Sequence, residues 1–485
     1  MRPAGQSPRR GTLRRTLLRR LLPWRGHLLG QTRTTLVVDM HAFDKLAYDP
    51  VSGIAIVGSG VLLGTMNEFL ESHGRMLPTG SCPTVGVGGQ VLAGGFGLSS
   101  RSAGLFLDNL VEMDVVLADG TAHTLSEEHM ADLYWGMRGA GASLAIAHTF
   151  RLRTHPAPPE VIYYELTLLP RSLDASSASI DRATRFYEAF EAFGGSALAT
   201  AELGMFAWHV TPEQGPGRAQ WGTKVEVLGQ YMGDRAGFDS VMRGFERTLR
   251  DMGESNYHLG FRRLSFLESM HQVGGNWTRL VDRGPLNINE HVNFYAKSLL
   301  TKRPIAGDDM HAHLSHLLNL SPVVNPGKDI EWFVLSPYLG GQHSAVTKPS
   351  PNTTAFAHRD LRVVWELYAK SLDEQAESPV NLVPFVKRMA RDLGDPEAVY
   401  PAYVDGEIAE GDYARLIWGE NYRRLQGVKA KYDPANLFRY PQSVKPPSSH
   451  TASFAALLVL CALVLFLLRR HASNRRKGKP RLRVD

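Results

Sequence analysis

Residues 77–97 read LPTGSCPTVGVGGQVLAGGFG, and this stretch decides how the chain is interpreted. Seven glycines lie between Gly80 and Gly97, which is too dense for a stable helix and too ordered for a linker. Glycine is needed where a backbone approaches a ligand closely, or where successive N–H groups converge on an anion. A diphosphate joined to a flat ring system meets both needs. A tight glycine-rich corner without a ligand is the alternative.

The same stretch does not match the dinucleotide-binding fingerprint of doubly wound folds. That fingerprint needs G-x-G-x-x-G at the opening of a helix directly after a strand, with an acidic residue about 20 residues later. Residues 86–91, GVGGQV, lack the third glycine. A nicotinamide-dependent domain is therefore disfavoured.

Strands and short helices are expected on both sides of this stretch. Residues 54–57 predict a strand, and residues 61–73 predict a helix with one apolar face. Residues 110–117 predict another strand, followed by an Asp-Gly turn and a hairpin partner. Residues 146–152 predict the strand that closes the unit. The glycine-rich stretch therefore belongs to an α+β domain.

Three separated segments of the chain resemble the berberine-bridge-enzyme-like branch of the FAD-linked oxidoreductases, which share a PCMH-type FAD-binding domain with vanillyl-alcohol oxidase. The matching motifs are GSCPTVGVGG at 80–89, GGFG at 94–97, DLYWGMRG at 132–139, TAFAHR at 354–359 and WGENYRRLQGVKAKYDPANLFRYPQ at 418–442. The resemblance implies an α+β fold: a PCMH-type FAD-binding domain joined to a substrate domain, in which helices back an antiparallel sheet.

The expected organisation follows from this resemblance and from the composition of the two ends. We expect an FAD-binding domain at 36–157 with its N-terminal part truncated, and a substrate domain at 158–395. A berberine-bridge-like segment at 396–444 returns to the FAD-binding domain. The remaining parts are a basic leader of uncertain status at 1–35, a transmembrane helix at 452–469 and a basic tail at 470–485.

The resemblance also implies which residues bind FAD. A Cys at the position of Cys82 attaches covalently to the flavin ring at C6 in the family, and Val85 stands where the family controls oxygen access. Gln90 replaces a His that often contacts the ring. The other residues expected to bind the cofactor are Gly86, Gly88, Gly89, Gly94, Gly95, Asp108, Asn109 and Ile146.

A second covalent link is implied at the N-terminus. The family begins with a subdomain that ends in Gly-Gly-His, whose His attaches to the flavin 8α-methyl group. Arg25-Gly-His27 stands at roughly the right spacing, so His27 is a candidate flavin ligand. A chance Gly-His in an arginine-rich leader is the alternative. The stretch before residue 36 shows no such subdomain, which an incomplete gene model would explain.

Two tyrosines are the expected catalytic residues. Residues 400–403 read Tyr-Pro-Ala-Tyr, where the family usually has Tyr-x-Asn-Tyr. In some members such tyrosines serve as a base or as part of one, which requires a lowered pKa. Tyr400 is the first candidate and Tyr403 the second, and ordinary core aromatics are the alternative. No metal site is predicted, because His311, His313 and His316 do not share one helical face, and a solvated helix is expected there.

The expected activity is that of an FAD-dependent oxidase. It transfers a hydride from an alcohol, sugar or amine to the flavin and then passes electrons to O2. A degenerate flavoprotein with an incomplete FAD site is one alternative, favoured by Gln90 and Ala402. A flavin dehydrogenase with another electron acceptor is the other.

Charge and hydropathy at the two ends predict a membrane partner and exclude nucleic acid. The first 38 residues hold nine Arg, and the last 17 hold eight Lys or Arg. Without these ends the chain has 37 basic and 47 acidic residues, so a body that binds nucleic acid is not expected. Residues 453–468 are continuously apolar and precede basic residues, which predicts a single-pass C-terminal anchor in a lipid bilayer.

Overall fold

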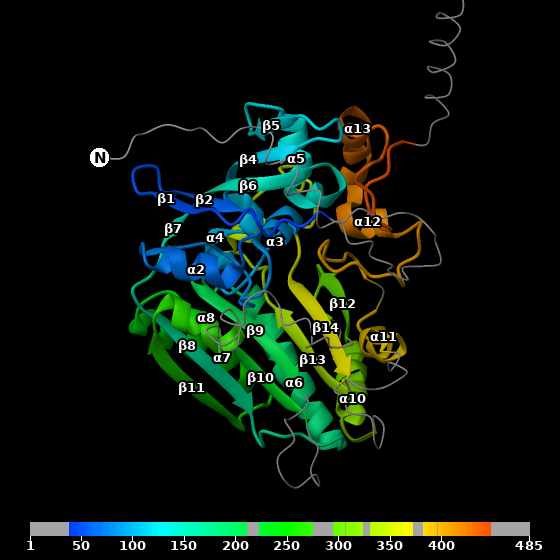
Figure 1. Cartoon of the computed structure of the whole chain (residues 1–485). Coiled ribbons are helices and arrows are strands. Elements are labelled where there is room, and N and C mark those ends of the chain that lie inside the picture. The colour runs from blue at the N-terminus through cyan, green and yellow to red at the C-terminus, as the bar shows by residue number, and fades with distance from the viewer. Residues whose placement is uncertain are drawn as a thin grey trace, which may run out of the picture.

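Two antiparallel sheets organise the chain. The computed structural model describes residues 38–210, 223–274, 294–305, 307–323, 330–371, 382–394 and 396–447. A five-stranded sheet with its helices forms the upper domain in Figure 1, and a seven-stranded sheet forms the lower domain. The glycine-rich stretch lies in the upper domain, close to the boundary between the two.

The upper domain has the strand order β1-β2-β6-β4-β5. Its strands are β1 (Leu46–Asp49), β2 (Ile54–Gly58), β4 (Leu110–Val116), β5 (Ala122–Leu125) and β6 (Ile146–Arg153). The small strands β3 (Arg75–Met76) and β7 (His155–Pro156) pair with each other. Its helices are α2 (Leu63–Glu71), α3 (Val87–Ala93), α4 (Ser100–Ala103) and α5 (Ala131–Ala140), with 3-10 turns η2 (Phe106–Asn109) and η3 (Gly141–Ser143).

Alternation along the strands of the upper domain sets its core. Ala55 and Val57 of β2 are fully buried, whereas Ile54 and Ile56 between them are only partly buried. Successive side chains of a strand point to opposite faces of the sheet, so one face packs against helices and the other stays open. The helix-facing side chains join those of α2, α3 and α5 in one hydrophobic core.

The lower domain is a seven-stranded sheet in the order β11-β8-β10-β9-β13-β14-β12. Its strands are β8 (Val161–Leu168), β9 (Leu203–Val210), β10 (Lys224–Tyr231), β11 (Tyr257–Leu264), β12 (Phe294–Thr301), β13 (Ile330–Pro337) and β14 (Val363–Ser371). Its helices are α6 (Ser177–Gly195), α7 (Arg235–Asp251), α8 (Phe266–Gly274), α10 (Gly307–Val323) and α11 (Val383–Arg391), and η4 (Ala345–Thr347) precedes β14.

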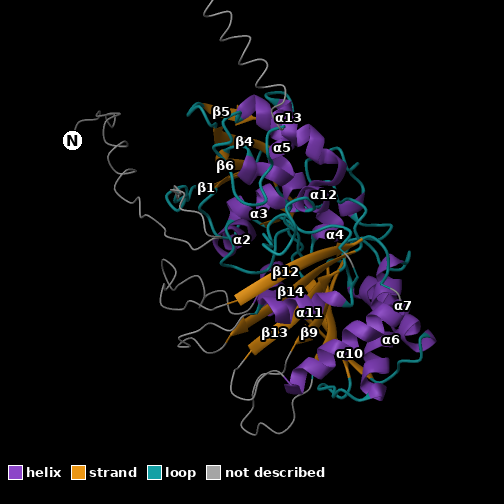
Figure 2. Ribbon diagram, turned by 90° about the vertical axis from the view of Figure 1, so that its right-hand side faces the viewer, coloured by secondary structure: helices purple, strands orange, loops and turns teal. Residues whose placement is uncertain are grey.

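One face of this sheet is covered by α6, α7 and α10, which stand together on one side of the strands in Figure 2. Side-chain caps help to start two of these helices: Ser176 accepts a hydrogen bond from Ser179 N, and Asp234 accepts one from Gly237 N. On β14 the buried residues Trp365 and Leu367 face these helices. Glu366 and Tyr368 therefore face the opposite side, toward the upper domain and solvent.

The C-terminal segment returns to the upper domain. Helices α12 (Tyr413–Trp418) and α13 (Tyr422–Tyr432), joined by η5 (Gly419–Asn421), lie beside α5 in Figure 1. Trp418 Nε1 donates to Gly139 O at 3.0 Å, and Leu425 and Val428 enter the upper core. The chain thus passes from the upper domain to the lower domain and back.

The expectation of a transmembrane helix is corrected. Among the described residues, no helix is long and apolar enough to cross a membrane. Even the 19-residue helix α6 carries Asp181, Arg182, Arg185, Glu188 and Glu191, and charged side chains at this density are incompatible with a span. Residues 452–469, where the helix was placed, lie outside the described residues. The fold class of the described residues is therefore α+β with two large antiparallel sheets, and the single-pass membrane localisation and lipid-bilayer partner are withdrawn.

The expectation of a solvated helix at the three histidines is also wrong. Helix α10 packs on the seven-stranded sheet, and His313 is fully buried, 5.5 Å from the ring of Trp365. His311 and His316 lie at the helix margins beside Asp181 and Asp392. A 3.6-residue period places one face of a helix in the core and the other in solvent, so a polar side chain such as His313 can still lie on the buried face.

Candidate active site

The glycine-rich stretch forms a compact loop, α3 and a second turn. Gly94 has a φ of +133° and Gly95 a φ of +75°, conformations that side-chain-bearing residues rarely adopt. A Cβ added at Gly95 would lie 2.5 Å from Phe106 Cβ, and one at Gly94 would lie 3.2 Å from the Tyr400 ring. Glycine is therefore required at this turn so that the two domains can meet.

The first half of the loop borders open space instead. A Cβ added at Gly86 or Gly89 would meet nothing within 4 Å, whereas one at Gly88 would lie 3.0 Å from Ser59. The side chain of Gln90 crosses the loop, where its Oε1 accepts a hydrogen bond from Gly80 N at 3.3 Å. The backbone around Gly86 and Gly89 can thus be approached closely by a ligand, while Gly88 and Gln90 hold the loop in shape.

Cys82 and Val85 lie at the surface of this loop. Both side chains are exposed, and Val85 N donates to Cys82 O at 3.4 Å. Protein atoms nevertheless crowd the Cys82 thiol, and this partial desolvation, together with the negative charge of Glu366, raises the pKa of the thiol to about 11. Glu366 of the lower domain therefore lies within electrostatic reach of Cys82.

Tyr400 joins the loop to the lower domain. Its hydroxyl accepts a hydrogen bond from Gly95 N at 2.9 Å, and its backbone N donates to Ser298 Oγ on β12 at 2.9 Å. The ring is buried and lies 5.0 Å from the ring of Phe96. Burial raises the pKa of Tyr400.

Tyr403 is paired with a carboxylate. Its hydroxyl donates to Glu366 Oε2 on β14 at 3.1 Å, and its ring lies 5.9 Å from that of Tyr400. Burial, then the charge of Glu366, raises the pKa of Tyr403. Burial also raises the pKa of Glu366 to about 7, while the Tyr403 hydrogen bond acts in the opposite direction. A carboxyl group with this pKa can exchange protons at neutral pH.

Glu366 is the site residue that the sequence reasoning missed. It is an acidic residue in the strand VVWELYAKS, where the alternate positions are apolar and buried. An isolated carboxylate that faces away from a helix-backed core was the available signal, although only the fold shows that this face meets Tyr403.

Asp108 and Asn109, which were also expected to bind the cofactor, form hydrogen bonds and an ion pair with other residues of the protein. Asp108 forms a two-point ion pair with buried Arg359, at 2.7 and 2.8 Å, and accepts from Leu105 N. Asn109 donates to Ala103 O and Leu105 O, and its Oδ1 lies 2.6 Å from His155 Nε2. Their roles toward a cofactor stay predictions.

Two further predicted residues are placed elsewhere. Ile146 is half-buried at the start of β6, opposite Val116. His27 lies outside the described residues. The structure therefore brings together Cys82, Val85, the glycine-rich loop, Tyr400 and Tyr403.

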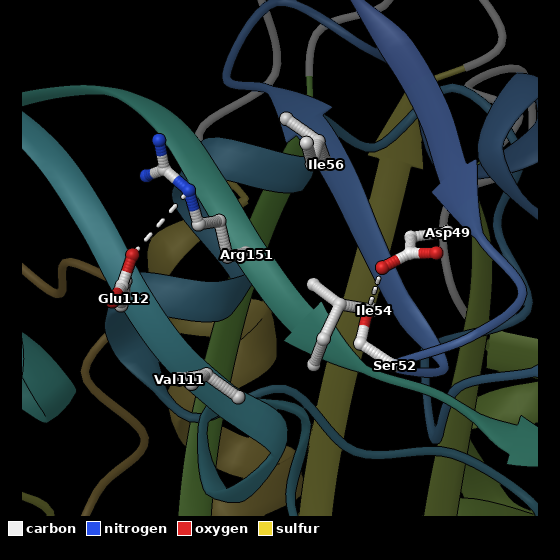
Figure 3. Close-up of a pocket in the computed structure, with 7 residues that line it drawn as sticks. All are labelled: Asp49, Ser52, Ile54, Ile56, Val111, Glu112 and Arg151. Atoms are coloured by element: carbon white, nitrogen blue, oxygen red, sulfur yellow. Dashed lines mark hydrogen bonds and ion pairs between the residues drawn. The ribbon is translucent and has the colours of Figure 1, made fainter.

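A separate shallow hollow lies on the open face of the five-stranded sheet (Figure 3). It is lined by Asp49, Ser52, Ile54, Ile56, Val111, Glu112 and Arg151. Arg151 is paired with Glu112 at 3.4 Å, and Ser52 donates to Asp49. Its charged groups have partners, and none of the candidate site residues lines it, so the hollow is not the site of the chemistry.

Comparison with known proteins identifies the family. The model of an FAD binding domain matches residues 25–126, and the model described as berberine and berberine like matches residues 399–445. A carbohydrate oxidase of Microdochium nivale is 30% identical over 438 residues, which cover 87% of this chain and 79% of that protein. The chain belongs to the berberine-bridge-like FAD-linked oxidoreductases.

Solved structures agree with this berberine-bridge-like assignment. Xylooligosaccharide oxidase from Myceliophthora thermophila, in complex with xylobiose, matches with a TM-score of 0.71 and 27% identity, covering 85% of this chain and 82% of that one. Glucooligosaccharide oxidase from Acremonium strictum, which carries a 6-S-cysteinyl, 8α-N1-histidyl FAD, matches with a TM-score of 0.69 and 25% identity, covering 84% and 81%.

The residues of this berberine-bridge-like chain fit FAD. A ligand can approach the backbone at Gly86 and Gly89, where an added Cβ would meet nothing within 4 Å, and the Cys82 thiol of the same loop is exposed. The Tyr403–Glu366 pair, whose carboxylate acts electrostatically on Cys82, places groups that can move a proton near this loop. FAD is therefore the cofactor of this enzyme.

Proposed function

We propose that the enzyme oxidises a hydroxyl group of an oligosaccharide and passes the electrons to O2. The observation that carries this proposal is the Tyr403–Glu366 hydrogen bond of 3.1 Å, located beside Cys82 and the glycine-rich loop. Bound FAD supplies the hydride acceptor in such a reaction. The protein must then bind the sugar, orient its C–H bond and remove the hydroxyl proton.

Tyr403 and Glu366 together can remove that proton. A tyrosine with a raised pKa is a poor base alone, because its phenolate is strongly disfavoured at neutral pH. When Tyr403 takes the substrate hydroxyl proton, its own proton can pass along the existing hydrogen bond to Glu366 Oε2. The carboxylate must be deprotonated to accept it, which a pKa of about 7 permits for a large fraction of molecules at neutral pH.

This arrangement assigns different tasks to the two tyrosines. The hydroxyl of Tyr400 is held by Gly95 N and its ring is buried, so it orders the loop. Tyr403 is only half-buried and has a proton acceptor. Tyr403 is therefore the proposed base, and Tyr400 supports the cofactor loop.

A row of aromatic rings favours a sugar substrate. Tyr368, two residues after Glu366 on β14, lies 4.7 Å from Phe333 on β13 and 5.4 Å from Phe294 on β12. Phe333 lies 5.8 Å from Trp208 on β9. The rings of Tyr368, Phe333 and Phe294 are nearly parallel, whereas the Trp208 ring is tilted against Phe333. All four are at least partly exposed, so they form an apolar wall next to Glu366. Apolar walls with a few polar groups are typical of small-molecule sites, and the family relatives above act on carbohydrates.

Cys82 and Val85 support the oxidase and covalent parts of the proposal. Cys82 is exposed on the glycine-rich loop, so its sulfur would be available to hold a flavin bound there. Val85 is a small apolar side chain, 38% exposed, which leaves room for O2 beside it. We propose that FAD is attached through Cys82 and that O2 is the electron acceptor.

The test uses the full chain and a panel of glucose-based and xylose-based oligosaccharides, with their monosaccharides alongside. Peroxide release that depends on an oligosaccharide supports the proposal. Reduction of an artificial dye without peroxide would instead indicate a dehydrogenase. A colourless protein that reacts with no sugar would indicate a degenerate flavoprotein, and the proposal would then be abandoned.

A further inference from the structure

The segment that carries Tyr403 is fastened to the edge strand β12 at several points. Leu300 N donates to Ala398 O at 2.9 Å, and Tyr400 N donates to Ser298 Oγ at 2.9 Å. Tyr403 N then donates to Tyr400 O at 3.1 Å, which turns the chain back toward β14. The base therefore projects from a turn whose incoming arm is held by β12.

The outgoing arm of the turn is held at Asp405, two residues after Tyr403. The Asp405 side chain is 2% exposed. Its carboxylate accepts a hydrogen bond from the Tyr295 hydroxyl at 2.5 Å and forms an ion pair with the Lys297 ammonium group. Tyr295 and Lys297 both belong to β12. The same strand thus holds both arms of the Tyr403 turn.

The backbone of Asp405 is tied to the C-terminal segment. Gln442 Nε2 donates to Asp405 O at 2.6 Å, and Asp405 N donates to Gln442 Oε1 at 3.2 Å. Gln442 is buried. Asp405 is consequently the point at which β12, the Tyr403 turn and the segment returning to the upper domain meet.

Because the Asp405 carboxylate is buried, its stability depends on the side chains that bind it. A carboxylate removed from water needs an opposite charge and donors, and removal of one partner leaves an uncompensated buried group. Lys297 and Tyr295 supply the charge and the donor that keep the Asp405 carboxylate in its buried position. Without them, the turn is expected to relax toward solvent and to carry the Tyr403 hydroxyl away from Glu366.

We propose that Asp405 is a positioning residue for catalysis, and that Lys297 and Tyr295 hold it so that the Tyr403 hydroxyl meets Glu366. This inference rests on the proposed function, because it holds that Asp405, Lys297 and Tyr295 keep the proposed base Tyr403 in position. The groups that face Glu366 are Tyr403, Tyr400 and Cys82, and those that face Asp405 are Lys297, Tyr295, Glu407 and Lys387.

The test compares full-length Lys297→Met and Tyr295→Phe with wild type, and uses Lys387→Met as the matched control. Lys387 forms an exposed ion pair with Glu407 at 2.8 Å on the same turn, but it does not bind the Asp405 carboxylate. Lys297→Met is expected to lower kcat about tenfold with KM nearly unchanged, since a displaced base slows the chemical step. Lys297→Arg restores part of kcat, and Lys387→Met leaves it unchanged.

A pH profile separates positioning from a general loss of stability. The Tyr403 hydrogen bond lowers the pKa of Glu366. Loosening it must therefore shift the acidic limb of kcat/KM to higher pH, by about half a pH unit in Lys297→Met and less in Tyr295→Phe. A lowered melting temperature with an unmoved profile, or the same shift in Lys387→Met, overturns the proposal.

A readout without turnover keeps this test independent of the substrate. The absorbance of the bound flavin is titrated against pH in wild type and each variant, because a neighbouring charge alters the flavin spectrum. If no sugar is oxidised, the proposed function fails, while the spectral titration still decides the positioning role. A pH midpoint that moves upward in Lys297→Met and not in Lys387→Met supports it, and identical midpoints refute it.

Discussion

The hydroxyl of Tyr403 donates a 3.1 Å hydrogen bond to the carboxylate of Glu366, which joins the turn before α12 to the open face of β14. The pair lies at the boundary of the two domains, because Tyr400 of the same turn binds Gly95 of the glycine-rich loop. Glu366 of the lower domain thus lies close to the glycine-rich loop of the upper domain.

Removal of either member of the pair should nearly abolish oxidation. We expect Tyr403→Phe and Glu366→Gln each to lower kcat/KM by about 10² to 10⁴, the usual contribution of a general base. The double variant should lose little more than either single variant, since the two groups act as one relay. Steady-state peroxide release measures this.

The same sheet offers a matched control for these substitutions. On β8, the Tyr163 hydroxyl donates to the Glu165 carboxylate at 2.9 Å. Strand β8 lies near the opposite edge of the sheet from β14. Glu165→Gln and Tyr163→Phe remove an equivalent hydrogen bond without touching the site. Wild-type-like activity in Glu366→Gln, or an equal loss in Glu165→Gln, would contradict the proposed base.

The pH dependence of kcat/KM should follow the deprotonation of Glu366. Burial raises the pKa of this group to about 7, and the relay needs its carboxylate form. Activity is therefore expected to rise about tenfold per pH unit below pH 7 and to level off above it. The Tyr403→Phe variant loses the hydrogen bond that lowers the pKa of Glu366. The acidic limb of any residual activity should therefore move to higher pH. A profile that stays flat between pH 5 and 8 would be inconsistent with Glu366 as the acceptor.

Cys82 should carry the flavin. In wild type the yellow colour is expected to stay with acid-precipitated protein, and a peptide that contains Cys82 should bear the cofactor. Cys82→Ala should yield an unmodified peptide. If His27 also links the flavin, colour stays in the pellet of Cys82→Ala and leaves it only in the double variant with His27→Ala.

The second cysteine of the chain provides the control. Cys461→Ala removes a thiol in the apolar C-terminal run and should leave the flavin peptide unaltered. Wild-type protein whose Cys82 peptide is unmodified would rule out attachment at this residue. Absorbance and peptide mass together measure both outcomes.

Local patterns predicted the cofactor loop, but contacts between distant segments could not be read from the chain. Gly94 and Gly95 were expected from the resemblance of GGFG at 94–97 to the family, and their positive φ angles explain why glycine is needed there. Glu366 and Tyr403 are 37 residues apart, and Lys297 and Asp405 are 108 apart. Their meeting depends on strand order and register in the seven-stranded sheet, which no local period encodes.

The errors have similar causes. His313 is polar, yet it is buried because α10 turns that side chain toward Trp365. The ranking of Tyr400 above Tyr403 is a separate case that stays a prediction, although the fold shows that the Tyr403 hydroxyl faces an acceptor. Hydropathy at 453–468 predicted a membrane span, and the described helices provide none.

Acid should destabilise the fold through His209. This residue of β9 is fully buried, and among the described residues neither of its ring nitrogens has a hydrogen-bond partner. Burial lowers the pKa of His209 to about 4. The unfolded chain therefore binds the proton more tightly, so stability is complete above pH 6.5 and is lost as pH falls from 6.5 toward 4.

The matched variants isolate this contribution of His209. Its effect approaches about 1.4 kcal/mol per pH unit in that range, and His209→Phe should remove it from the pH dependence of the free energy of unfolding. His258→Gln on the exposed side of β11 should not. Denaturant unfolding at pH 7, 6 and 5 measures the three proteins, and parallel curves for wild type and His209→Phe would disprove the prediction.

The buried ion pair of α13 should be the main fastening of the returning C-terminal segment. Lys429 and Asp433 have fully buried side chains, and Lys429 Nζ donates to Asp433 Oδ2, Ser143 O and Phe438 O, each at 2.6 Å. Lys429→Met leaves the Asp433 carboxylate buried without its cation, which costs about 3–5 kcal/mol. Lys431→Met on the same helix removes the exposed ion pair with Asp132 and a contact with the Tyr432 ring, and should lower the melting temperature much less than Lys429→Met does. Thermal unfolding of both variants distinguishes the two. Similar melting temperatures would mean that the apolar contacts of Trp418, Leu425 and Val428 hold the segment instead.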